Sequence, residues 1–197
     1  MPTMPTMPTI TTITTRRPLA LVASRCDQVT PLRQVLHQLV ELLDPLEPSA
    51  YTVKPVTTYG GSVGGHVRRC LDHVNALLLG LDGQLIDYEA RQRGTDVEND
   101  RDAALAEVER LDAALAALGP EVLEQAVTVS VCMSPERPAL DAASTVAREV
   151  AFVLNHTIHH HAMIGGMVKA LGGAVPAEFG MAPGTLRHQH QKQAAGA

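Results

Sequence analysis

The sequence of 197 residues is poor in aromatic side chains and in cysteine, and its charge shows no positive excess. Aromatic residues make up 3% of the chain and tryptophan is absent, so the core must be built from Leu, Val and Ala, a composition that favours helices. The three cysteines, Cys26, Cys70 and Cys132, are too widely spaced for a disulfide framework or a CxxC zinc pattern. This cysteine usage suits a reducing compartment, and we expect a cytoplasmic protein.

Charge and hydropathy exclude two classes of partner. Sixteen Lys and Arg residues against 21 Asp and Glu leave a net charge of −5 without a basic stripe, so no nucleic-acid partner is expected. No window approaches the roughly 18 consecutive apolar residues of a membrane span, so no membrane partner is expected. A chain of this length can form one domain without a structural metal, and a bound metal would therefore serve function.

The two ends of the chain differ in composition from the middle. Residues 1–15 repeat Met-Pro-Thr three times before a Thr-rich stretch, and each proline removes a backbone donor and disfavours helix. We predict a disordered segment over 1–25, a folded domain over 26–186 and a polar tail over 187–197 that contains His188 and His190. The apolar run after Arg17 is shorter than the h-region of a secretory signal, so export is not expected.

Helical spacing of Leu, Val and Ile predicts four helices. They are expected at about 30–44, 62–81, 95–118 and 140–171. Thr30 before a proline is interpreted as the first cap, and Thr95-x-x-Glu98 matches a capping box for the third helix. Valines that alternate with polar residues over 127–133 predict a short β-element between the third and fourth helices, and 86–94 is expected to be a loop. Four helices with moderate connections favour a mainly α fold, a four-helix bundle.

Four of the nine histidines fall within six consecutive residues of the fourth predicted helix. His156 and His160 lie one turn apart and within ~40° of each other, so both imidazoles can reach one metal ion. His159 lies about 60° to one side as a second-shell or alternate ligand, and His161, about 140° away, is expected to face elsewhere. Glu149 lies only ~20° from the direction of His156, and a carboxylate on that apolar face needs a partner.

The second predicted helix offers His66 and His73, which lie within ~20° of each other. Either can meet the His156 and His160 pair across the bundle. Three histidines leave a coordination position open, as in catalytic rather than closed structural sites, and imidazole suits zinc, iron and nickel. Cys70, on the same helix, is interpreted as a small core residue. Arg68 and Arg69 are interpreted as part of a solvated helix face.

Two segments resemble the DinB-like (YfiT-like) superfamily of four-helix-bundle metal-binding proteins. The first runs Ser-Val-Gly-Gly-His-Val-Arg-Arg-Cys-Leu-Asp-His over 62–73, and the second runs Asn-His-Thr-Ile-His-His over 155–160. The resemblance covers about 28–185. It implies an up-down-down-up bundle, usually a homodimer, with zinc, nickel or iron held by His66, His156 and His160. His66 is preferred over His73 because its place near the helix start matches the family pattern.

We therefore expect a divalent-metal-dependent enzyme that acts on a small-molecule substrate by transfer or hydrolysis. The metal would activate a thiol or water, and Glu149 or His73 would shuttle the proton. The resemblance favours thiol-dependent transfer with a low-molecular-weight thiol such as mycothiol or bacillithiol as co-substrate. One alternative is a non-catalytic module that binds metal or ligand, and another is a structural dimer whose histidines are pH-sensitive core groups.

Overall fold

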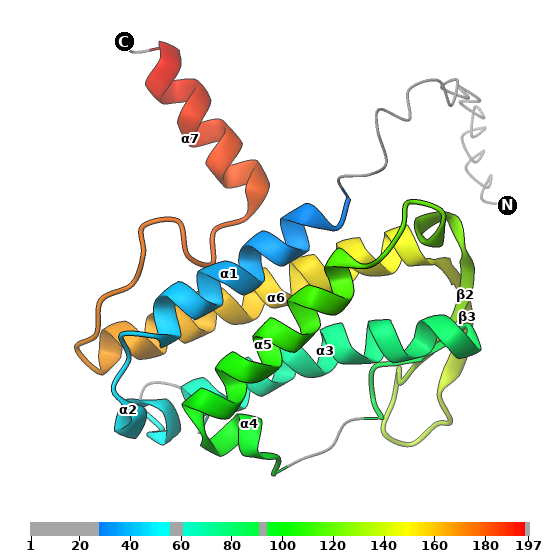
Figure 1. Ribbon diagram of the computed structural model, residues 1–197, viewed down its shortest axis with the longest axis horizontal. Helices are drawn as coiled ribbons and strands as arrows, with labels where there is room; N and C mark the ends of the chain where they lie inside the picture. Colours follow the sequence, from blue (N-terminus) through cyan, green and yellow to red (C-terminus); the bar gives the residue numbers. More distant parts are fainter. Residues whose placement is uncertain (1–27, 56–60, 91–93, 196–197) are drawn as a thin grey trace, which may run out of the picture.

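A computed structural model describes residues 28–55, 61–90 and 94–195 and shows four long helices side by side (Figure 1). They are α1 (Thr30–Leu43), α3 (Val63–Gly83), α5 (Arg101–Ala116) and α6 (Val146–Ala170). Both α1 and α3 contact α5 and α6, so the four helices close a ring around one core. The predicted mainly α bundle is confirmed. The predicted disordered segment over 1–25 lies outside the described residues.

The core consists of the aliphatic stripes of these helices. Each helix turns one side inward, and the largest side chains that are fully buried are Leu, Ile and a single tyrosine, namely Tyr51, Leu32, Leu36, Leu39, Leu42, Leu43, Leu71, Leu77, Ile86, Leu111, Leu115 and Ile164. Full burial of one such side chain contributes about 1.5–3 kcal/mol. Leu and Val supply most of the core, as predicted, but the predicted contribution of Ala is smaller: Ala104 is the one alanine among the buried hydrophobic residues of the described ranges, where Ile86, Ile158 and Ile164 also lie. In the described part of the chain, no helix combines the length and apolar content needed to cross a bilayer.

Shorter helices flank the bundle. They are α2 (Pro48–Thr52), α4 (Asp96–Asn99), the 3₁₀ turn η2 (Val122–Glu124) and α7 (Pro183–Ala195). Helix α7 extends away from the bundle (Figure 1), and none of its residues is buried. The polar end that shows no periodicity in the sequence is therefore largely helical. His188 and His190 are exposed on this helix.

A three-stranded sheet covers one end of the bundle, in the order β1-β2-β3. Strand β2 (Ala126–Val131) confirms the predicted β-element; it pairs in parallel with β1 (Leu85–Asp87) and antiparallel with β3 (Leu140–Thr145). In the register, Val129 lies opposite both Ile86 and Ala142. The predictions that 86–94 is entirely loop and that the fourth helix begins at 140 are wrong. Both added strands form because β2 satisfies their backbone groups.

Three of the helix starts test the sequence predictions, two of them predicted caps. The Ser62 hydroxyl accepts the Gly65 N–H, so the start of α3 is as predicted. Thr30 lies inside α1 without a capping bond, and Thr95 makes no side-chain cap, so these two predictions are wrong. The extended backbone at Asp100 breaks the third predicted helix into α4 and α5, and its carboxylate caps α5 instead.

Candidate histidine site

Helices α3 and α6 bring together the two histidine pairs predicted from the sequence. A Cβ at Gly64 would collide with the Glu98 carbonyl and the Tyr51 ring, so glycine lets α4 pack closely on the first turn of α3. This packing and the Ser62 cap place His66 near the start of α3. His156 and His160 face it from consecutive turns of α6. We call His66, His73, His156 and His160 the histidine cluster.

Three rings of the cluster are tilted toward one another. Nδ1 of His66 lies 2.8 Å from Nδ1 of His160, and these two rings are inclined by 49°. The centroids of His156 and His160 are 4.5 Å apart with an inclination of 60°. Because imidazole lone pairs lie in the ring planes, three inclined rings can direct nitrogens toward one point.

His73 has a different orientation. Its ring stacks on that of His156, with centroids 3.7 Å apart and an inclination of 19°. Its Nδ1 lies 2.8 Å from the Arg69 carbonyl oxygen. Because a carbonyl can only accept, Nδ1 of His73 carries the proton, and in the neutral ring Nε2 is the acceptor.

Burial favours the neutral form of two rings of the cluster, His66 and His160. Burial is the main cause of the lowered pKa of His66. The positive charge of Arg69 lowers this pKa further, and His159 has a smaller effect in the same direction. The pKa of His160 falls to about 3, first through burial and then through the charges of His156 and His66. Neutral imidazoles at pH 7 retain the lone pairs that a metal ion requires.

Glu149 lies at the other end of the same seam, with none of its surface exposed. Its Oε2 accepts from the Tyr88 hydroxyl at 2.9 Å, and its Oε1 accepts from Ser144 and from Arg148. The Tyr88 ring in turn stacks on His73 at 5.2 Å. Burial, followed by the charge of Glu149, raises the pKa of Tyr88 above its usual range, so its proton stays on the hydroxyl.

The four-helix bundle agrees with the family comparison. A family model described as the DinB superfamily matches residues 32–164. This chain belongs to the DinB superfamily. A curated relative, the FK506-binding protein 5 of Rhizopus delemar, is 30% identical over 105 residues, which are 53% of this chain and 27% of that protein. The chain thus spans about a quarter of that relative's length.

The DinB superfamily match includes every predicted site residue, from His66 to His160. The structure brings His66, His73, His156 and His160 together, whereas Glu149 reaches the cluster through Tyr88. As the side chains stand in the described ranges, no group of three or more His, Cys, Asp or Glu is arranged to hold a metal ion. Metal binding by this DinB superfamily chain therefore stays a prediction.

Sequence reasoning missed the roles of two residues near the cluster. Tyr88 falls in the predicted loop. The one signal of its burial in the sequence is that an aromatic residue stands among charged residues. Arg68 is buried and donates to Asp72 and Glu98, so its interpretation as a solvated residue is wrong. Arg69 is exposed, as predicted. Cys70 is buried and burial raises its pKa, as expected of a core thiol.

His161 faces away from the cluster, as its helical phase predicts. It is fully buried, its ring stacks on Phe179 at 4.4 Å, and neither ring nitrogen has a hydrogen-bond partner among the described residues. Burial lowers its pKa to about 3. Gly180, with φ of 73°, allows the chain after α6 to pass against the backbone at Ala162 and hold Phe179 in place.

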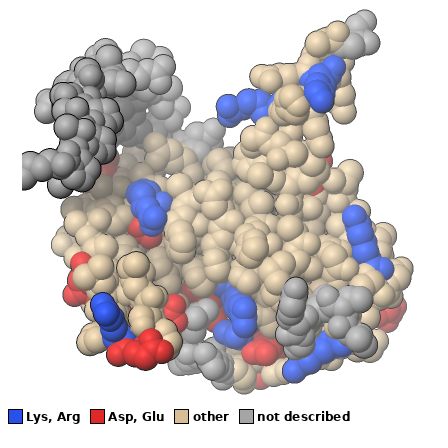
Figure 2. All heavy atoms as spheres, turned by 180° about the vertical axis from the view of Figure 1, so that it is seen from behind, with Lys and Arg blue, Asp and Glu red and all other residues tan. Residues whose placement is uncertain are grey.

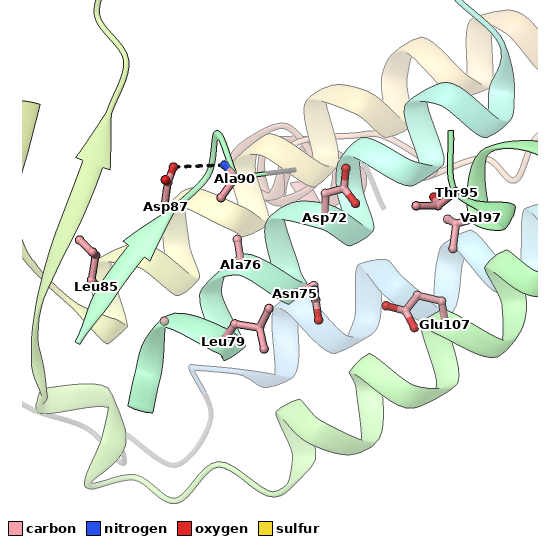
Figure 3. Close-up of a pocket in the computed structure, with 11 residues that line it drawn as sticks. Asp72, Asn75, Ala76, Leu79, Leu85, Asp87, Ala90, Thr95, Val97 and Glu107 are labelled. Atoms are coloured by element: carbon pink, nitrogen blue, oxygen red, sulfur yellow. Dashed lines mark hydrogen bonds between the residues drawn. The ribbon is translucent and has the colours of Figure 1, made fainter. Parts of the chain in front are cut away.

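A separate cavity of about 480 Å³ lies between α3, β1 and α5 (Figure 3). None of the histidines lines it, and its carboxylates already have partners. Asp72 pairs with Arg68 and Glu107 with Arg110, while Asp87 accepts from the backbone N–H groups of residues 89 and 90. We therefore assign the candidate site to the histidine cluster.

Proposed function

We propose that His66, His156 and His160 bind a divalent metal ion and that the protein uses it to transfer or hydrolyse a small molecule. The observation that carries the proposal is the inclination of the His66 and His156 rings toward that of His160 in the buried seam between α3 and α6. Membership of the DinB superfamily supports it.

The ring orientations favour His66 over His73 as the third ligand. The rings of His73 and His156 are stacked, so their lone pairs lie in nearly parallel planes 3.7 Å apart at the ring centroids, an arrangement less suited to two ligands of one ion than inclined rings. Nδ1 of His73 is also engaged with the Arg69 carbonyl. His66, by contrast, already has a nitrogen 2.8 Å from one of His160.

The donor set fits zinc, nickel or iron. All three ligands would be imidazoles, and the lowered pKa values of His66 and His160 keep these two deprotonated. When bound, such an ion supplies Lewis acidity that lowers the pKa of a thiol or water toward neutrality and makes it nucleophilic. We favour a low-molecular-weight thiol as the co-substrate.

We assign proton transfer to His73 and its positioning to Glu149. Nε2 of His73 is the acceptor in the neutral ring, so it can take the proton that the nucleophile releases. Tyr88 donates to Glu149 and stacks on His73, so Glu149 acts on His73 through Tyr88. The buried carboxylate thus serves to hold the ring that moves the proton.

Metal content is the first test. Full-length, tag-free protein carrying His188→Gln and His190→Gln would be reconstituted with zinc, nickel or iron and analysed by mass spectrometry. We expect about one ion per chain, and loss of this ion in His66→Ala, His156→Ala and His160→Ala. His37→Ala is the matched control, because His37 is an exposed histidine that pairs with Asp112. Unchanged metal content in the three cluster variants would refute the proposed site.

Turnover is the second test. Metal-loaded protein would be screened for consumption of low-molecular-weight thiols in the presence of electrophiles. We expect His73→Gln to lower turnover by about 10²-fold or more while metal content is kept. Stoichiometric metal without turnover would favour the alternative, a non-catalytic metal-binding or ligand-binding module.

A further inference from the structure

Two adjacent arginines on α3 have opposite surroundings. Arg68 is buried, and its guanidinium donates to the carboxylates of Asp72 and Glu98. Arg69 is exposed, and its side chain forms no ion pair or hydrogen bond with another residue in the described ranges. One positive charge is therefore neutralised within the protein, and the other remains accessible to a ligand.

Arg69 stands beside the histidine cluster. It follows His66 by three residues and precedes His73 by four, so all three lie on one side of α3. Its backbone carbonyl oxygen lies 2.8 Å from Nδ1 of His73, which places the residue against the cluster. His159 approaches from α6; it is exposed, and its ring edge meets His160 at 5.5 Å. We call Arg69 and His159 the rim.

The carboxylates near the rim are occupied elsewhere. Asp72 and Glu98 pair with Arg68, and Glu149 is buried with Tyr88, Ser144 and Arg148 around it. Seen from behind, much of the middle of the molecular face carries no charged side chain, and Lys, Arg, Asp and Glu gather toward its edges (Figure 2). Among the described residues, no acid compensates the charge of Arg69.

We propose that the rim recognises a carboxylate on the small molecule that reacts at the histidine cluster. A guanidinium presents paired N–H donors that match a carboxylate, and His159 offers one N–H even when neutral. In a chain with a net charge of −5, an anionic ligand needs such a local cation to approach. The inference rests on the proposed function, because it concerns the substrate of that same site.

The test compares thiols that differ in charge. Full-length, cobalt-loaded protein would be titrated with 3-mercaptopropionate, 2-mercaptoethanol and cysteamine, and binding would be followed by the thiolate-to-cobalt absorption band. For each thiol, the Kd of Arg69→Gln is divided by the wild-type Kd, so that differences in thiol acidity cancel. We expect a ratio of about five for the carboxylate thiol and about one for the neutral thiol at low salt. For cysteamine we expect a ratio below one, and all ratios should approach one at high salt.

Controls separate this inference from the proposed function. Arg69→Lys keeps the charge and should retain most of the preference, and Arg137→Gln removes another exposed arginine, on the connection between β2 and β3, and should change nothing. Equal ratios for the three thiols in Arg69→Gln would overturn the proposal that the rim recognises a carboxylate, but they would leave the proposed metal site intact. Failure of cobalt or of every thiol to bind would overturn the proposed function and the rim together.

Discussion

The two seams of the bundle differ in what they bury. Between α1 and α5 the buried side chains are aliphatic, such as Leu36 and Leu111, and the ion pair of Arg33 with Asp112 lies toward the surface. Between α3 and α6 the buried side chains include several histidines, and a fully buried carboxylate, Glu149, holds the end near the sheet. The comparison shows that one seam can supply stability while the other tolerates polar groups that have partners.

The largest expected effect comes from the aliphatic seam. Leu36→Ala removes a side chain with no exposed surface and leaves a cavity, so the free energy of unfolding should fall by about 2–5 kcal/mol, measured by urea denaturation. Val40→Ala, at a partly buried position on the same helix, should cost less. Equal losses in the two variants would show that this seam is loosely packed.

His161, on the side of α6 that faces away from the cluster, tests through the pH dependence of stability how a buried histidine behaves outside the polar seam. Its folded pKa of about 3 lies below the ordinary 6.5, so the unfolded chain binds a proton below pH 6.5 that the folded chain does not bind. Stability conferred by the neutral ring is complete above pH 6.5 and is lost progressively as the pH falls toward 3. Relative to wild type, His161→Leu should therefore gain about 2 kcal/mol between pH 8 and pH 5 in urea denaturation.

His160 also contributes to the pH dependence of stability, but its contribution is the same in wild type and in His161→Leu and therefore cancels when the two are compared. His37→Leu, at an exposed histidine, should show a much smaller change with pH. If the stabilities of wild type and His161→Leu run parallel from pH 8 to pH 5, His161 is not held neutral in the folded protein.

Two tyrosines provide a matched pair of variants whose expected effects on stability are intermediate. Tyr88→Phe removes a donor from the buried Glu149, and Tyr51→Phe removes the hydrogen bond to the Val97 carbonyl, 2.6 Å long. Each should cost about 1–2 kcal/mol in urea denaturation. Only Tyr88→Phe should also shift the NMR signals of His73, because only Tyr88 stacks on that ring. Equal shifts in both variants would argue against a specific link from Glu149 to the cluster.

The smallest effect is expected at the surface of the aliphatic seam. Nε and Nη2 of Arg33 donate to the two oxygens of Asp112 at 2.7 and 2.9 Å, but the arginine side chain is 34% exposed. A double-mutant cycle with Arg33→Ala and Asp112→Ala should give a coupling of about 0.2–1 kcal/mol that shrinks in salt. A coupling above about 2 kcal/mol would mean that this pair is more desolvated than its exposure indicates.

Local patterns predicted much of the bundle and of the histidine cluster. Apolar spacing predicted the four long helices, and the separation of His156 and His160 by one turn placed both on one face because helical phase is a local property. The strand at 140–145 could not be predicted in the same way. Its alternating side chains are short and its partner is β2, so the pairing depends on a neighbour rather than on its own sequence.

The sequence alone determined which residues are apolar, where helices continue and which histidines share a helical face, since these depend on composition and on the geometry of one helix. Only the tertiary structure decided that Arg68 is buried while Arg69 is exposed, that Tyr88 links Glu149 to His73, and that His66 rather than His73 is inclined toward His160. These outcomes depend on how neighbouring helices are rotated and packed against each other, which the spacing within any single helix does not specify.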